Sequence, residues 1–170
     1  MKGFTLVEVL AASVILAVLM VALFLVLGLG QRSWIRGDVN IQLQQEISRA
    51  LVVMARELKE TAPKKVSISP SDTIKFNIPQ DLNGDGSVID SVGAIEWSPD
   101  ITYSLNGSNQ ITRTFNGATS IIANNISALQ FALVLNEDSV VRIDITASKI
   151  SNAGQLVQDN GETIVKMRNE

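Results

Sequence analysis

One unbroken apolar run near the start of the chain constrains the fold more than any other feature. From Val9 to Gly30 no side chain is charged, and the apolar segment extends from Leu6 to Leu29. About 20 apolar residues at a rise of about 1.5 Å span the roughly 30 Å hydrocarbon layer of a bilayer, and lipid offers no partner for free backbone groups. The apolar core of a secretory signal peptide is shorter, about 7 to 15 residues. We therefore predict a retained helix that spans a membrane.

The helical pattern continues beyond this run in amphipathic form. Gln31, Arg32, Trp34 and Arg36 suit the membrane surface, where a tryptophan ring and arginine side chains reach the headgroups. Apolar side chains then recur every three or four residues up to Pro63, which favours a helix packed on its own domain over a homomeric coiled coil. This apolar stripe comprises Ile35, Val39, Leu43, Ile47, Leu51, Met54 and Leu58.

From Lys64 onward the apolar pattern alternates, which predicts strands. The alternating sets are Ile74, Phe76 and Ile78; Ile101, Tyr103 and Leu105; Leu129, Phe131 and Leu133; and Val141, Ile143 and Ile145. Turn residues at 106–109, 116–118 and 136–139 separate them, and we expect a polar loop at 151–161 before a last strand at 162–168. The prediction is an α+β fold. A long N-terminal helix, membrane-spanning in its first half and amphipathic in its second, packs on one face of a single antiparallel β-sheet.

Composition removes several classes of function. The 170 residues contain no histidine and no cysteine, so the commonest general base, thiol nucleophile and zinc ligands are missing. The serines and carboxylates form no recognisable catalytic constellation, and we predict that the chain is not an enzyme and requires no cofactor. The net charge of -3 lacks the basic bias of a nucleic-acid binder, so we expect no nucleic acid to bind the soluble region.

The N-terminal residues Gly3-Phe4-Thr5-Leu6-Val7-Glu8 resemble the cleavage and methylation motif of type IV pilins and of type II secretion pseudopilins. This resemblance implies a pilin-like lollipop fold, which agrees with the helix and sheet expected above. Downstream segments are similar to those of minor pilins and J-type minor pseudopilins, and the chain lacks the paired cysteines of many major pilins. These segments are residues 44–61, 103–107, 124–131 and 165–169.

The resemblance also implies how the N-terminus is processed. A prepilin peptidase would cut between Gly3 and Phe4, where glycine leaves the backbone accessible, and would methylate the new amino group of Phe4. With Lys2 in the cytoplasm, the protein would cross the inner membrane once, keep its C-terminal domain outside the cytoplasm, and later enter a pilus or pseudopilus. The expected organisation is a leader at 1–3, a transmembrane and filament-core helix at 4–30, its amphipathic continuation at 31–62 and an antiparallel β-sheet domain at 63–170.

Glu8 places an acid in the apolar segment, where a charge costs roughly 2.5 to 3.5 kcal/mol by insertion scales. In one interpretation its carboxylate reaches the headgroup region. In the other, which the resemblance favours, it pairs with the amine that cleavage creates on Phe4 of a neighbouring subunit. A stagger of one helical turn brings the two groups together, and the low dielectric around them strengthens the attraction. We therefore predict that Glu8 is a subunit-assembly residue.

A second candidate site is an Asp-x-Asn-x-Asp-Gly sequence that begins at Asp81. It places oxygens at the first, third, fifth and seventh positions of a calcium loop, with glycine at the sixth. The match is partial, because Val92 occupies the twelfth position, where an EF-hand has its glutamate. The alternative is a solvated turn without metal. The predicted calcium ligands are Asp81, Asn83, Asp85, Ser87 and Asp90.

Two functions follow from these features. The first is a minor pilin or pseudopilin that co-assembles through its N-terminal helix into a type IV pilus or type II secretion pseudopilus, either within the filament or in the tip complex that initiates it. Its partners would be prepilin peptidase, other pilins or pseudopilins and the inner-membrane assembly platform. The second is a membrane-anchored, calcium-dependent binding module outside the cytoplasm. The motif around Glu8 favours the first, since a simple anchor needs neither the cut nor the acid.

Overall fold

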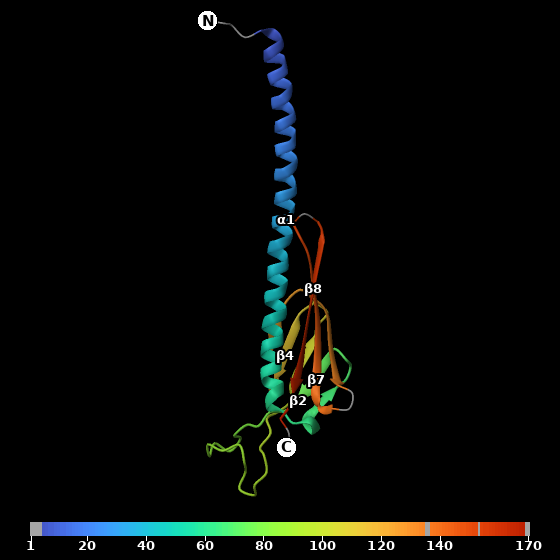
Figure 1. Cartoon of the computed structure of the whole chain (residues 1–170). Coiled ribbons are helices and arrows are strands. Elements are labelled where there is room, and N and C mark those ends of the chain that lie inside the picture. The colour runs from blue at the N-terminus through green and yellow to red at the C-terminus, as the bar shows by residue number, and fades with distance from the viewer. Residues whose placement is uncertain (1–4, 135–136, 153, 169–170) are drawn as a thin grey trace.

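A single helix occupies the first third of the chain. The computed structural model describes residues 5–134, 137–152 and 154–168. Helix α1 (Leu6–Glu60) has 55 residues and is therefore about 83 Å long at a rise of about 1.5 Å per residue. In Figure 1 its first half projects alone, and its second half lies along the strands. The predicted long helix with an apolar first half is confirmed.

Antiparallel strands follow the helix. After a short 3-10 helix, η1 (Pro63–Lys65), the described strands are β1 (Val66–Ile68), β2 (Thr73–Phe76), β3 (Ile101–Leu105), β4 (Ile111–Phe115), β5 (Ala118–Ala123), β6 (Ile126–Val134), β7 (Glu137–Ile150) and β8 (Leu156–Lys166). They form a five-stranded sheet in the order β1-β2-β3-β4-β5 and a three-stranded sheet in the order β6-β7-β8. The α+β class is confirmed, but the single sheet that the sequence predicted is wrong.

The division between the sheets lies at the link between β5 and β6. Asn125 adopts a positive φ of 59°, a conformation that asparagine tolerates better than most residues. Its carbonyl oxygen accepts a hydrogen bond from the backbone N–H of Ser148 in β7 (2.8 Å), and the N–H of Ile126 donates to the carbonyl of Asn109 (2.9 Å). These bonds turn the chain away from β5, so β6 pairs with β7 and starts the second sheet.

The core lies between α1 and the two sheets. From the predicted stripe of α1, the structure buries Val39, Leu43, Ile47, Met54 and Leu58, packs the half-buried Leu51 against them, and leaves the side chain of Ile35 outside the described set. The sheets contribute Ile74, Phe76, Ile101, Tyr103, Leu129, Phe131, Val141, Ile143 and Ile145. Two residues of the predicted alternating sets differ. Ile78 lies beyond the end of β2, and half of the Leu133 side chain is exposed.

Helix α1 lies close against a sheet at Gly161, in the middle of β8. A Cβ atom at this position would overlap Cγ2 of Ile47 and lie 3.2 Å from Cδ1 of Leu51. The sequence predicted a polar loop here, with a strand only from 162, because Asn, Gly and Asp are typical turn residues. The structure instead begins β8 at Leu156 and pairs Gly161 with Ile145 of β7. The glycine is needed because the helix occupies the space of its side chain.

We predict that Gly161→Ala destabilises the fold. The added methyl group must displace Ile47 or lift α1 from β8, and overpacking of this kind costs about 1 to 3 kcal/mol. Urea unfolding of the full chain in detergent micelles, followed by tryptophan fluorescence, measures the change. Gly107→Ala is the matched control, since a Cβ there meets nothing within 4 Å. Equal unfolding free energies for the two variants would contradict the close contact.

A polar cluster joins the second half of α1 to the five-stranded sheet. Glu57 of α1 accepts hydrogen bonds from the hydroxyl of Tyr103 (2.8 Å) and from Nε of Arg113 (3.1 Å), and Nη2 of Arg113 lies 3.1 Å from its Oε1. Burial, and then the charge of Glu57 with its hydrogen bond, raises the pKa of Tyr103, so the phenol stays protonated. Burial lowers the pKa of Arg113, but the hydrogen bond and charge of Glu57 outweigh it and leave this pKa raised. The guanidinium also lies 5.2 Å from the ring centroid of Phe115.

We predict that Glu57→Ala lowers the free energy of unfolding by about 1 to 3 kcal/mol, because it leaves a partly buried guanidinium and a buried phenol without their acceptor. Tyr103→Phe removes one hydrogen bond and should cost less, about 1 kcal/mol. Thermal unfolding followed by circular dichroism checks both values. The control is Glu60→Ala. Glu60 is exposed and lies three residues beyond Glu57 on α1. This substitution should shift the free energy of unfolding by less than about 0.5 kcal/mol.

The longest connection in the chain lies at the end of the molecule opposite the N-terminus. It joins β2 to β3 and projects beyond the C-terminal end of α1, as the green and yellow-green trace in Figure 1 shows. Isolated bridges pair Pro79 with Trp97 and Ile89 with Ile95. At its base, Thr61, the C-cap of α1, donates from its hydroxyl to the carbonyl of Asn77 (2.6 Å). We call residues 77–100 the distal loop.

Candidate processing and assembly site

The start of α1 is closed by a reciprocal pair of side chains. Thr5 is the N-cap, and its Oγ1 accepts a hydrogen bond from the backbone N–H of Glu8 (3.3 Å). In return, Oε2 of Glu8 accepts from the backbone N–H of Thr5 (2.9 Å) and from its hydroxyl (3.0 Å). This capping box satisfies two N–H groups that a helix start otherwise leaves without partners.

The capping box gives Glu8 a role that the sequence analysis missed. The signal was present, because Thr5-Leu6-Val7-Glu8 has the Thr-x-x-Glu spacing of a capping box. A carboxylate in the first turn also faces the positive end of the helix dipole, which stabilises it. Both bonds with Thr5 use the same oxygen, Oε2. The acid can therefore cap its own helix and present Oε1 to a second donor.

The helix that follows Glu8 is apolar and is not covered by the rest of the chain. The segment Leu6–Gly28 has 23 residues, an 18-residue stretch within it has a mean hydropathy of 3.1, and none of it is buried inside the molecule. At about 1.5 Å per residue it is about 35 Å long, which matches the hydrocarbon thickness of a bilayer. Trp34 follows, 82% exposed, at the position predicted for the membrane surface.

The sequence comparisons bear on this same N-terminus. The predicted cleavage residues Gly3 and Phe4 lie outside the described residues, so the geometry of the cut is not part of the structure. A family model for the prokaryotic N-terminal methylation motif matches residues 1–24. This motif indicates a type IV pilin-like or pseudopilin-like prepilin. No curated protein and no solved structure significantly matches the chain.

For a prepilin, the motif implies processing by a prepilin peptidase and assembly with other pilin-like subunits. The apolar helix and the motif together indicate membrane anchoring. The pilin family is generally structural, which agrees with a site whose described side chains cap a helix and are exposed on its surface. The described part of the prepilin motif thus consists of the capped helix start at Thr5 and Glu8 and the uncovered apolar helix.

The predicted calcium residues lie in the distal loop, where they bind backbone groups of the loop itself. Asp81 accepts from the N–H groups of Gly86 (2.8 Å) and Gly84 (2.6 Å), which lower the pKa of its carboxyl group. The loop therefore favours the charged carboxylate. This contribution is present above the ordinary Asp pKa of about 3.9 and is lost as the pH falls through the lowered folded-state value.

The other predicted ligands continue this pattern over two successive turns. Asn83 Oδ1 accepts from the N–H of Asp85, whose Oδ1 in turn accepts from the N–H of Ser87. Asp90 Oδ1 accepts from two N–H groups of the next turn, those of Val92 and Ala94. Among the described residues, no group of three or more acidic side chains converges closely enough to hold a metal ion. A bound calcium ion would have to replace some of these backbone donors.

Calcium binding by the distal loop stays a prediction. We expect saturable heat when calcium is titrated into the full chain in detergent micelles at millimolar concentration, and loss of that heat in Asp81→Asn, which removes a charge from the first ligand position. Magnesium is the control ion, because it requires a tighter octahedral site. If the wild-type chain gives no calcium heat, the solvated-turn interpretation of this loop is correct.

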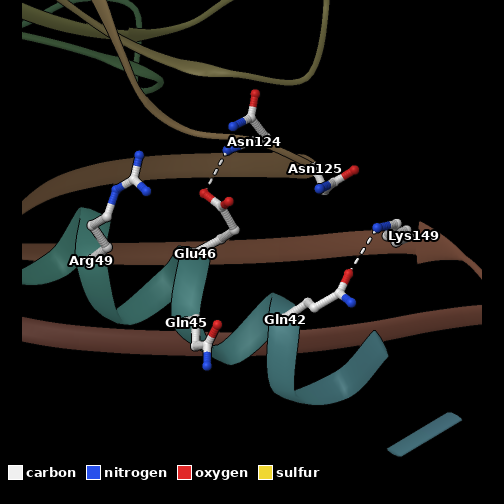
Figure 2. Close-up of a pocket in the computed structure, with 7 residues that line it drawn as sticks. All are labelled: Gln42, Gln45, Glu46, Arg49, Asn124, Asn125 and Lys149. Carbon is white, nitrogen blue, oxygen red and sulfur yellow. Dashed lines mark hydrogen bonds between the residues drawn. The ribbon is translucent and has the colours of Figure 1, made fainter. Parts of the chain in front are cut away.

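A polar pocket lies where α1 meets the link between the two sheets. Figure 2 shows its lining residues, which are Gln42, Gln45, Glu46, Arg49, Asn124, Asn125 and Lys149. Glu46 accepts from the backbone N–H of Asn124 (3.0 Å), Arg49 donates from Nε to the carbonyl of Ile122 (3.0 Å), and Lys149 donates to Oε1 of Gln42 (2.9 Å). These bonds tie both sheets to the helix, so the pocket is a structural joint. Sequence periodicity could not reveal it, because its partners are 73 to 107 residues apart.

Proposed function

We propose that this chain is a minor pilin or pseudopilin, a structural subunit that co-assembles through α1 into a type IV pilus or a type II secretion pseudopilus. Its place is either within the filament or in the short tip complex that initiates it. The observation that carries the proposal is Glu8, an exposed acid in the first turn of a 23-residue apolar helix that its own chain does not bury. A helix of this kind needs either lipid or other helices around it.

In this proposal the protein has two successive environments. It first lies in the inner membrane with Lys2 in the cytoplasm and the sheets outside, held there by the apolar segment. Prepilin peptidase then removes residues 1–3 and methylates Phe4, and the inner-membrane assembly platform transfers the subunit into the filament. The apolar helix exchanges lipid for neighbouring helices, so its hydrophobic surface remains out of water throughout.

The new amine of Phe4 supplies the partner of Glu8. Phe4 and Glu8 are four residues apart, or about 6 Å along a helix, so a stagger of about one turn places the amine of one subunit beside the carboxylate of the next. Oε2 of Glu8 is engaged with Thr5 of the same chain, and Oε1 is the oxygen assigned to the amine. The pair compensates a charge that would otherwise be unfavourable among apolar helices.

We predict that Glu8→Gln and Glu8→Ala leave membrane insertion and cleavage intact but strongly reduce incorporation into filaments. Glutamine keeps an oxygen for the capping box and loses only the charge. Immunoblots of sheared filament fractions measure incorporation, and the size shift of the processed chain measures cleavage.

Thr5→Ala is the matched control, because it removes the capping box and keeps the acid. If Glu8 acts only through the cap, Thr5→Ala should fail as severely as Glu8→Ala while Glu8→Gln assembles normally. Normal incorporation of both Glu8 variants would instead support the anchored binding module, which uses the helix only as a tether.

A further inference from the structure

The polar pocket where α1 meets the link between the sheets is large enough for a small molecule. Its volume is about 540 Å³, within the range of about 300 to 1,000 Å³ that is usual for ligand pockets. All seven lining side chains end in amide or charged groups. Most ligand pockets are instead lined largely by apolar side chains. The lining therefore excludes a hydrophobic ligand and favours one that is polar over its whole surface.

The hydrogen bonds that hold the pocket together use only one end of each side chain. Arg49 donates from Nε to the carbonyl of Ile122 (3.0 Å), which fixes the guanidinium and leaves both Nη groups. Oδ1 of Asn124 accepts from Nε2 of Gln110 (2.9 Å), which leaves its Nδ2 as a donor. Oε2 of Glu46 accepts from the N–H of Asn124 (3.0 Å), which leaves Oε1 as an acceptor. Within the described part of the chain, no further hydrogen bond or ion pair engages these remaining atoms.

The charges of the pocket alternate along α1. Lys149 is held beside Gln42 by a hydrogen bond (2.9 Å), and Arg49 lies seven residues, or about 10 Å, further along the helix. Glu46 lies between them (Figure 2). A single compact anion cannot reach both cations, and at either one it would lie within about one helical turn of the carboxylate of Glu46. The pocket is therefore poorly suited to phosphate or sulfate.

Hydroxyl groups match this arrangement better than an anion does. A hydroxyl donates one hydrogen bond and accepts others, so neighbouring hydroxyls can bond to Oε1 of Glu46 and to the Nη groups of Arg49 at the same time. The side-chain amides of Gln45 and Asn125 each offer a donor and an acceptor. The planar guanidinium presents paired N–H donors to two adjacent oxygens. A sugar carries hydroxyls on successive carbons, so it supplies such pairs.

The pocket lies beyond the reach of phospholipid headgroups. Gln42 is 14 residues beyond Gly28, the last residue of the apolar segment, and so lies about 21 Å from it along α1. The headgroup layer on each side of a bilayer is only about 5 to 8 Å thick. A ligand of this pocket therefore comes from the aqueous side of the membrane.

We propose that this pocket binds a short, neutral oligosaccharide. The residues assigned to its hydroxyl groups are Gln45, Glu46, Arg49, Asn124 and Asn125. Because hydrogen bonds fix Glu46, Arg49 and Asn124 before a ligand arrives, little side-chain entropy is lost on binding. The inference goes beyond the proposed function, since co-assembly through α1 needs no ligand in the soluble region.

Saturation-transfer NMR of the full chain tests the proposal, in dodecylphosphocholine micelles, which contain no sugar. The probes are cellobiose, maltotriose and N,N′-diacetylchitobiose, and inorganic phosphate is the competing anion. We expect saturable transfer from the protein to at least one of the three saccharides at millimolar concentration. Equimolar phosphate should not displace the bound saccharide, because Glu46 opposes an anion in the pocket.

Single substitutions separate hydroxyl binding from charge. Arg49→Lys keeps the positive charge but loses the paired donors, so the saccharide should bind several-fold more weakly. Gln45→Ala removes a lining amide that takes no part in the hydrogen bonds described above. It should weaken binding without lowering the thermal unfolding temperature. The matched control is Arg56→Lys, on the exposed surface of α1 and outside the pocket, which should leave binding unchanged.

Three results would overturn the proposal. These are absence of transfer to all three saccharides at tens of millimolar, displacement of the saccharide by equimolar phosphate, and unchanged binding in both Arg49→Lys and Gln45→Ala. The second would make the pocket an anion site. None of these results depends on Glu8, so failure here is distinguishable from failure of the assembly role tested by Glu8→Gln.

Discussion

The packing of the second half of α1 on β8 positions the helix on the three-stranded sheet. This packing requires a glycine at position 161, because the lack of a side chain there lets Ile47 and Leu51 lie directly on the strand. Fully burying a side chain such as leucine, isoleucine or methionine contributes about 1.5 to 3 kcal/mol, so the buried stripe of α1 is a major stabilising contact of a fold without disulfides. With α1 fixed on the three-stranded sheet, Glu57 can reach Tyr103 and Arg113 in the other one.

Sequence periodicity was sufficient to predict most helices and strands, but it could not predict which elements pack or pair with one another. The stripe from Val39 to Leu58 predicted which face of α1 is buried, because helical spacing is a local property. The division into two sheets depends on what Asn125 bonds after the turn, and its partner is Ser148, 23 positions later. The sequence predicts the end of a loop at Gly161 for a similar reason. Its role depends on a helix more than 100 residues earlier in the chain.

At the N-terminus the sequence was informative about chemistry and less so about geometry. Glu8 stood out because charges are rare in apolar segments, and the motif gave it an expected partner in another subunit. The structure adds a partner within the chain, Thr5, through the capping box. At the predicted calcium loop the sequence and the structure emphasise different partners for the acidic side chains. The spacing of its oxygens suggested metal ligation, whereas the described loop uses Asp81, Asn83 and Asp90 as acceptors for its own N–H groups.

The polar joints along α1 have a mechanical consequence for a subunit whose helix is pulled along its axis. Glu46 holds the link between the sheets, and Arg49 and Glu57 hold the five-stranded sheet, so these attachments are spread over 12 residues, or about 16 Å of helix. Tension parallel to α1 loads them together in shear instead of opening them one after another. Resistance to forced unfolding is governed by the unfolding rate, and shared loading slows that step. The long helix would thus transmit force past the sheets while keeping them attached.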